Sequence, residues 1–193
     1  RFLLIYFTPL GSATCLSSNN YLMTLSRKLV TLNANGLRNA KNRCKLFRQL
    51  KGKGEIVLLQ ETHSQPADEK YWSNLLGGGK MYFAHGDSNA RGVAIYFDKT
   101  IDFQVKYTYR DEDGRLLIIV TEIDGIQICI INAYAPNLSS NTNDRLAHEN
   151  FFENILAKMN DIKTTHKVSE FMLGGDFNLI RDNYYDAYGG SPV

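Results

Sequence analysis

The sequence of 193 residues has few cysteines, few prolines and no long apolar run. Its three cysteines, Cys15, Cys44 and Cys129, are far apart and form no CxxC or other metal-binding spacing. We therefore expect reduced, structural thiols in an intracellular protein, and no zinc site. No apolar run approaches the ~20 residues that a membrane span requires, so no membrane partner is expected.

Acidic residues are missing from the first part of the chain, and the first of them is Glu55. Ten of the 22 basic residues precede it, so from Glu55 onward 12 basic residues stand against all 20 acidic ones. This division favours a basic surface that binds a polyanion, together with an acidic remainder that holds a cation. A solvated helix face without a partner explains the charges equally well.

Internal repeats, low-complexity tracts and linkers are also missing, which predicts a single folded domain. We assign residues 28–193 to that domain. Residues 1–27 are expected to be a poorly ordered leader or an upstream remnant. A secretory signal peptide is the less favoured alternative, because the apolar run at 2–7 is short.

Hydrophobic patterns predict many strands and few helices. Strands are expected at 28–33, 55–61, 80–84, 92–97, 101–109, 115–124, 126–133 and immediately before Asp176, with a type I′ hairpin at Asp124-Gly125. Helices are expected at 39–50 and 67–76, and a third begins at Asn143 or Asp144 with Leu146, Ala147, Asn150, Phe151, Leu156 and Met159 on one face. Several strands are apolar at successive positions, so both their faces need cover and the sheets need a layer on each side.

Polar side chains stand where four of these strands end, at Asn33, Glu61, Tyr134 and the pair Asp176 and Asn178. Polar groups at the ends of buried strands commonly line one cleft. If the last strand runs through residue 178, its side-chain period of two places Asp176 and Asn178 on the same face. A strand that simply ends in a Gly-Asp turn is the alternative.

Oxygen atoms at two of these positions suit a hard divalent cation. Mg²⁺ is typically held by one or two carboxylates with water and substrate phosphate, and Glu61 with the amide oxygen of Asn33 fits that description. Asn33 could instead cap the turn before Gly36, and this is equally well supported. Glu61 as a surface acid and Tyr134 as a half-buried aromatic residue are the corresponding structural alternatives.

Five short segments resemble motifs of the endonuclease/exonuclease/phosphatase superfamily, in order and at matching spacing. They are TLNANGLR (31–38), LLQETH (58–63), RGVAIYF (91–97), INAYAPN (131–137) and GGDFN (174–178). Within the superfamily, the NxNGLR, QETH and YAPN forms favour the apurinic-type endonuclease domain of non-LTR (long interspersed element) retrotransposons. The resemblance covers roughly 28–182 and implies an α/β fold, a four-layered α/β/β/α sandwich of two mixed sheets.

The resemblance also implies a role for each matching catalytic residue. Glu61 and Asn33 would bind Mg²⁺, with Mn²⁺ as an alternative ion, and Tyr134 would orient the scissile phosphate. Asp176 would activate the attacking water as a general base, while Asn178 would hold a phosphate oxygen in the transition state. The implied reaction is hydrolysis of a phosphodiester.

The implied partner is DNA, nicked on one strand so that its 3′ end primes reverse transcription. Asn132 and Asn137, which flank the tyrosine, and Arg38 and Lys41 in the basic segment would contact or support the substrate. A reverse transcriptase domain in the same polyprotein is the further partner implied, and the action would be nuclear, although no localisation signal is written in the sequence.

The chain also departs from the family pattern. The family completes its site with a later Asp and a Ser-Asp-His, and no Ser-Asp-His occurs here. We therefore expect an N-terminal piece, with its sandwich incomplete at the C-terminal end and its activity impaired. Two other functions remain open, a catalytically dead nucleic-acid-binding remnant and a phosphoesterase for lipid or inositol phosphates. The four histidines, His63, His85, His148 and His166, are interpreted as structural or solvent-exposed.

Overall fold

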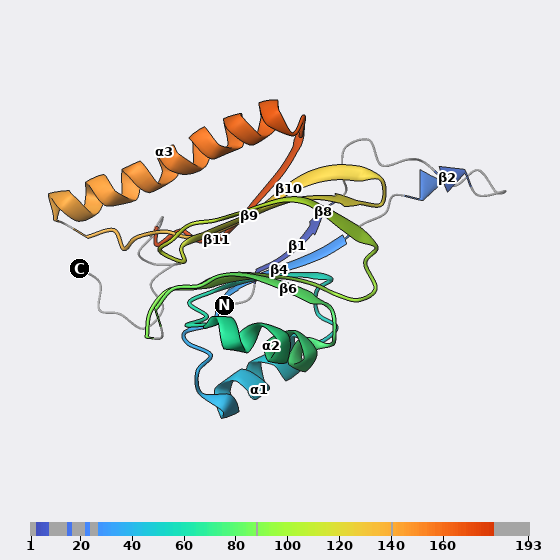
Figure 1. The fold of residues 1–193 in the computed structure, drawn as a ribbon, viewed down its shortest axis with the longest axis horizontal. Helices are drawn as coiled ribbons and strands as arrows, with labels where there is room; N and C mark the ends of the chain where they lie inside the picture. Colours follow the sequence, from blue (N-terminus) through green and yellow to red (C-terminus); the bar gives the residue numbers. More distant parts are fainter. Residues whose placement is uncertain are drawn as a thin grey trace.

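Two β-sheets lie face to face in the computed structural model, and helices cover the outer face of each sheet (Figure 1). The structure describes residues 3–7, 15–16, 22–23, 27–87, 89–139 and 141–179. The order of layers is helix, sheet, sheet, helix, which confirms the predicted four-layered α/β sandwich.

Both sheets are mixed. The first contains, in spatial order, β1 (Leu3–Phe7), β4 (Arg27–Asn33), β5 (Ile56–Gln60), β7 (Val93–Phe97) and β6 (Lys80–Ala84). The second contains β11 (Glu170–Asp176), β10 (Ile126–Tyr134), β9 (Leu116–Ile123) and β8 (Phe103–Arg110). The pairs β4–β5 and β10–β11 are parallel, whereas the other neighbours are antiparallel.

Three strands fall in the segment that the sequence analysis assigned to a leader. Strand β1 pairs antiparallel with β4, with Leu3 opposite Thr31 and Phe7 opposite Arg27. Strands β2 (Cys15–Leu16) and β3 (Leu22–Met23) form a separate antiparallel pair. The first sheet therefore extends one strand beyond β4.

The main core lies between the two sheets. Strand β5 is buried at every position, and β9 is buried at every position but one. Alternate residues of each strand face the opposite sheet, as Leu58 and Ile119 do, while their neighbours Leu59 and Ile118 face the helices. Cover on both faces explains why the sequence of these strands is apolar at successive positions.

Helices α1 (Ala40–Leu50) and α2 (Glu69–Leu76), with the short 3₁₀ helix η1 (Pro66–Asp68), cover the first sheet (Figure 1). Asn39 caps α1 by accepting hydrogen bonds from the backbone N–H groups of Lys41 and Asn42. Trp72 is the central side chain of this layer, with edge contacts to Phe47 and Phe83 at ring separations of 6.3 and 6.1 Å.

Helix α3 (Thr142–Thr165) covers the second sheet. Its start differs from the prediction, and its predicted face is confirmed only in part, since Phe151 and Met159 pack against the sheet. Asn141, rather than Asn143 or Asp144, is the N-cap, and it accepts a hydrogen bond from the backbone of Asn143. The buried residues are His148, Ile155 and Ile162, whereas Leu146 and Leu156 are 54% and 59% exposed. Contact with the sheet sets the rotation of the helix, and apolar residues on both sides of α3 conceal that rotation in the sequence. No helix in the described part of the chain is long and apolar enough to cross a membrane.

Candidate active site

A continuous set of backbone hydrogen bonds links the loops at one end of both sheets. It joins Ala34 N to Gln60 O, Gly36 N to Glu61 O, Thr62 N to Gly92 O, Gly92 N to Gly114 O, Tyr134 N to Arg115 O and Ala135 N to Asp176 O. These bonds are 2.7–2.9 Å long. The loops that follow these strand ends are therefore fixed to one another across both sheets, and polar side chains from either sheet meet at this rim.

Asn33, Glu61 and Asp176 converge at the rim, as the sequence predicts. The Asn33 Nδ2 group donates one hydrogen bond to Glu61 Oε1 and one to Asp176 Oδ2, each 2.8 Å long. The two carboxylate oxygens are thus separated by no more than twice that distance. Asn33 Oδ1 also accepts a hydrogen bond of 2.9 Å from Asn35 N, so the residue caps its turn and contacts both acids.

Tyr134 lies beside the two acids. It pairs with Asp176 in the parallel register of β10 and β11, and its half-buried ring packs against the core between the sheets. Burial, followed by a hydrogen bond to Glu61 and the negative charge of that group, raises the pKa of Tyr134 to about 12. The phenol is therefore neutral and able to donate a hydrogen bond throughout the physiological range.

The pKa of Tyr134 predicts a measurable titration difference. Near pH 11, Tyr134 should remain neutral in the folded protein, since its pKa is about 12 there, but should ionise in the unfolded chain at about 10. The free energy of unfolding therefore falls as pH rises from 10 to 12, because Tyr134 ionises more readily in the unfolded chain than in the folded protein. Phenolate absorbance at 295 nm should be equal for wild type and Tyr134→Phe when folded at pH 10.5–11 (roughly the midpoint of that window), and lower in the variant after denaturation. An equal absorbance after denaturation, or a deficit already present in the folded variant, would contradict the raised pKa.

Strand β11 ends at Asp176, so the expectation that Asp176 and Asn178 share one face of a continuous strand is wrong. Asn178 has a positive φ of 49°, its N–H donates to Asp176 Oδ1, and its side-chain amide donates to Ala135 O at 2.7 Å. The turn, rather than strand periodicity, returns Asn178 towards the acids. Phe177 points to the other side and packs against Phe152 of α3.

A glycine permits the close pairing beneath this turn. A Cβ atom on Gly175 would lie 1.9 Å from Ala133 O, and its φ of 152° is also unfavourable for other residues. The backbone of β10 therefore lies directly against Gly175, where any larger residue would collide with it. Beside it, a cleft of about 340 Å³ opens between the ends of β4 and β11, lined by Asn33, Gln60, Asp176 and Asn178 among others.

Asn132 does not line the cleft. It is fully buried between the sheets, where its amide donates to Leu59 O and Ala94 O and its oxygen accepts from Gln60 Nε2, at 2.7–2.9 Å. A residue with no exposed atom cannot bind a substrate directly, so the expected substrate-binding role of Asn132 becomes one of holding the two sheets together. Asn137, three residues after Tyr134, is exposed in the following loop.

The basic residues expected to contact substrate lie beside α1. Arg38 forms an ion pair with Asp68 of η1, so part of its charge is already compensated. Lys41, in the first turn of α1, is exposed. Arg43 on the same helix is buried, and donates to the carbonyl oxygens of Leu37 and Arg38. The basic segment is thus partly a surface and partly internal structure.

Arg115 is a site residue that the sequence analysis missed. Its guanidinium lies 5.2 Å from the centre of the Tyr134 ring and donates weakly to the carbonyl oxygens of Tyr134 and Ala135, at 3.3 and 3.4 Å. No carboxylate forms an ion pair with it among the described residues, and burial lowers its pKa. The sequence does mark this residue, since Arg115 stands immediately before the apolar run of residues 116–120.

The acidic side chains at the rim fit a hard cation. Glu61 and Asp176 provide carboxylate oxygens. The Asn33 amide turns its Nδ2 group to both acids and its Oδ1 to Asn35 N, so Asn33 would have to reverse its amide to offer an oxygen to the cation. No cluster of three or more His, Cys, Asp or Glu residues occurs in the described ranges. Mg²⁺ does not need such a cluster, because one or two carboxylates with water and phosphate suffice.

Comparison with known proteins identifies the family of the chain. A family model described as the Endonuclease/Exonuclease/phosphatase family matches residues 30–189. The "Transposon TX1 uncharacterized 149 kDa protein" of Xenopus laevis is 30% identical over 159 residues, which are 82% of this chain and 11% of that protein. The chain therefore spans about a tenth of this curated relative. These matches confirm the resemblance that the five motifs indicated.

Solved structures show the same fold. The AP endonuclease LMAP from Leishmania major has a TM-score of 0.62 at 20% identity, covering 84% of this chain and 58% of that one. The mannosyl-6-phosphatase Bt3783 of Bacteroides thetaiotaomicron has a TM-score of 0.61 at 13% identity, covering 83% of this chain and 69% of that one. The family model matches residues 30–189, and the fold is a two-sheet sandwich with acidic side chains at one rim. The chain therefore belongs to the Endonuclease/Exonuclease/phosphatase family.

Proposed function

We propose that the chain is a Mg²⁺-dependent DNA endonuclease domain that hydrolyses a phosphodiester bond and nicks target DNA for retrotransposition. The single observation that supports it most is the convergence of Glu61 and Asp176, from different sheets, on the Asn33 amide. The transposon relative supports DNA as the substrate. In that setting the chain would act in the nucleus, beside a reverse transcriptase in the same polyprotein.

Each rim residue has a role in this proposal. Asp176 accepts the proton of the attacking water, whose oxygen forms a bond to phosphorus while the bond from phosphorus to the 3′ oxygen breaks. Tyr134, a neutral phenol, orients a phosphate oxygen by donating its one hydrogen, which must turn from Glu61 to the substrate. Asn178 has a second amide hydrogen available for the transition-state oxygen. Glu61 and Asn33 would hold Mg²⁺, or Mn²⁺, which when bound neutralises charge on the phosphate.

Arg115 adds a positive charge to an otherwise acidic rim. Because it lacks a carboxylate partner among the described residues and lies over Tyr134, we assign it to phosphate binding. The exposed Lys41 would contact the DNA backbone farther from the cut, with Asn137 close to the tyrosine. Such contacts are expected to weaken as salt concentration rises.

Replacing Arg115 with Ala is therefore expected to reduce nicking by about 10²-fold, the size expected when one preorganised charge is removed from a phosphate site. Arg91→Ala is the matched control, since that guanidinium is already paired with Asp113 and Asp87. Nicking of supercoiled plasmid under single-turnover conditions measures both. Equal loss in the two variants would contradict a specific role for Arg115.

A phosphoesterase that acts on lipid or inositol phosphates is the second candidate, favoured by the shared fold with a sugar phosphatase. Supercoiled plasmid and a panel of inositol phosphates, each with Mg²⁺ or with EDTA, separate the two functions. The proposal expects Mg²⁺-dependent conversion of plasmid to the nicked circle and no phosphate release from inositol phosphates. DNA binding without nicking would favour the non-catalytic, nucleic-acid-binding alternative.

A further inference from the structure

The loop that presents Glu61 has an unfavourable backbone conformation. Glu61 and His63 have positive φ values of 50° and 53°, a region that non-glycine residues seldom occupy. Such conformations persist only where the surrounding structure imposes them. The contacts that hold residues 61–65 therefore determine where the Glu61 carboxylate lies.

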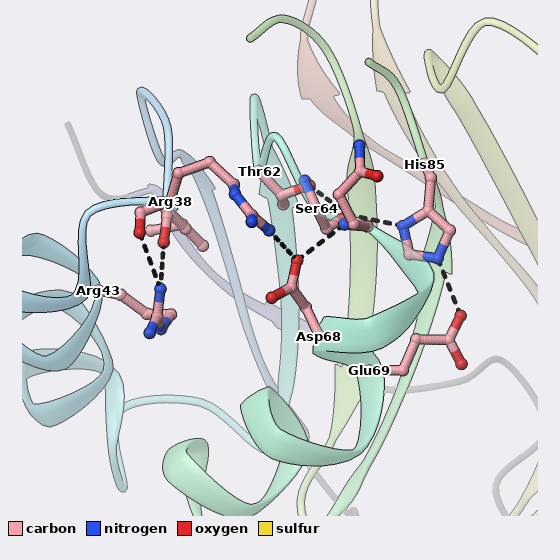
Figure 2. A network of polar contacts seen from close by, with 9 residues as sticks. Arg38, Arg43, Thr62, Ser64, Asp68, Glu69 and His85 are labelled. Carbon is pink, nitrogen blue, oxygen red and sulfur yellow. Dashed lines mark hydrogen bonds and ion pairs between the residues drawn. The ribbon is translucent and has the colours of Figure 1, made fainter. Parts of the chain in front are cut away.

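A chain of side-chain hydrogen bonds holds this loop from beneath (Figure 2). Thr62 Oγ1 lies 2.9 Å from Ser64 Oγ, Ser64 Oγ lies 2.9 Å from His85 Nδ1, and His85 Nε2 lies 2.9 Å from Glu69 Oε1. Thr62 and Ser64 are fully buried, so no water competes for the bond between them, whereas the bond from His85 to Glu69 is exposed. This series of hydrogen bonds connects the loop that presents Glu61 to the end of β6 and the start of α2.

The proton positions follow from the chemistry of the groups. The Glu69 carboxylate only accepts, so His85 Nε2 carries the hydrogen and, in the neutral ring, Nδ1 accepts from the Ser64 hydroxyl. The Ser64 oxygen is then free to accept from Thr62. Each hydrogen bond in this series thus joins one donor to one acceptor, and His85 is the residue that sets the direction of the series.

A second set of bonds fixes the same loop at its far end. Asp68 accepts a hydrogen bond from the backbone N–H of Gln65 at 2.9 Å and forms the ion pair with Arg38, as Figure 2 shows. Arg43 in turn holds the carbonyl oxygens of Leu37 and Arg38. The loop after β4, which follows Asn33, and the loop after β5 are thereby fixed to one support.

We propose that His85 is a positioning residue for Glu61, and that its Nδ1 contact with Ser64 sets the affinity of the rim for a divalent cation. This inference rests on the proposed function for the identity of the cation site. It assigns a role to a histidine outside the site, which follows the end of β6, a strand that contributes no group to the reaction. His85 touches neither the acids nor the substrate cleft in the described structure.

Two substitutions separate the Ser64 contact from the Glu69 contact. In His85→Asn, the shorter side chain places a polar atom near the former Nδ1 and keeps Ser64. In His85→Gln, the longer side chain reaches Glu69 and leaves Ser64 unpaired. Both variants lose the stacking of the imidazole on Phe83, whose ring centre lies 5.3 Å away, so that contribution cancels in the comparison.

The affinity for Mn²⁺, measured by calorimetry or by electron paramagnetic resonance, is the first readout. We expect His85→Gln and Ser64→Ala to weaken Mn²⁺ binding by about 10-fold or more, the size found when residues that orient metal ligands are removed. His85→Asn should stay within about twofold of wild type, since it keeps the orienting contact. Neither measurement requires DNA cleavage.

Hydrogen exchange of the Thr62 and His63 amides is the second readout, and it requires no metal. These amides donate to Gly92 O and Arg91 O, so their exchange reports on the loop directly. Faster exchange in His85→Gln and Ser64→Ala, but not in His85→Asn, would support the proposal even if the wild-type chain does not nick DNA. Equal behaviour of His85→Asn and His85→Gln in both readouts would overturn it, and so would unchanged Mn²⁺ affinity in Ser64→Ala.

Discussion

Replacing Asp176 with Asn is expected to lower the rate of plasmid nicking by about 10²–10⁴-fold, the range that general-base catalysis supplies. The amide that replaces the carboxylate cannot accept a proton from water at neutral pH. The backbone contact from Asn178 N to Oδ1 can be kept by the amide oxygen, whereas the new amide nitrogen would face the Asn33 Nδ2 group that now donates to Oδ2. Urea unfolding of the variant therefore accompanies the rate measurement, so that lost stability is separated from a loss in the chemical step.

Single-turnover nicking of supercoiled plasmid with the enzyme in excess is the appropriate measurement, because it remains sensitive when the wild-type rate is low. Asp113→Asn provides the control, since this acid is exposed and its one ion pair among the described residues is with Arg91. A surface pair of that kind contributes ~0–1 kcal/mol, so the control should nick and unfold like wild type. A nicking rate for Asp176→Asn within about threefold of wild type, far inside the expected loss, would remove Asp176 from the reaction.

The strand ends were predictable because each is marked in the local sequence. The apolar run before Glu61 is buried at every position, and such a strand has no other place for a polar residue than its end. The run before Asp176 is only half-buried, with Leu173 38% exposed, and its end is marked instead by the two glycines before the acid. The hairpin at Asp124-Gly125 was predictable for a similar reason. Both residues have positive φ, 52° and 79°, which this pair of residues adopts readily.

What the sequence did not predict depends on contacts between distant elements. The rotation of α3 is set by the sheet beneath it, so the exposed Leu146 and Leu156 look the same in sequence as buried residues. Arg115 was overlooked because it belongs to none of the five motifs. Only the pairing of β9 with β10 brings it to Tyr134, a residue of the fourth motif. His85, likewise, meets Ser64 only because β6 and the loop after β5 are neighbours of β7.

Asn132 shows how a motif residue can be essential without meeting the substrate. Its side chain bridges β10 of one sheet to β5 and β7 of the other, through Leu59 O, Ala94 O and the Gln60 amide. The pairing across the sheets fixes the distance between Glu61, one residue after β5, and Tyr134, two residues after Asn132 on β10. Asn132 thus affects the site by fixing the positions of Glu61 and Tyr134 at the rim.

Asn132→Ala is accordingly expected to reduce the free energy of unfolding by about 3–5 kcal/mol, because three hydrogen bonds are lost and their partners remain buried. That is a large share of the ~5–15 kcal/mol that stabilises a typical domain. Asn132→Asp should be at least as damaging, since its oxygen would replace the amide donor opposite two carbonyl oxygens. Urea unfolding monitored by circular dichroism measures both, with the exposed Asn137→Ala as a control expected within about 0.5 kcal/mol of wild type. If Asn132→Ala unfolds at the same urea concentration as Asn137→Ala, the bridge contributes nothing and the two sheets are held together by their apolar core alone.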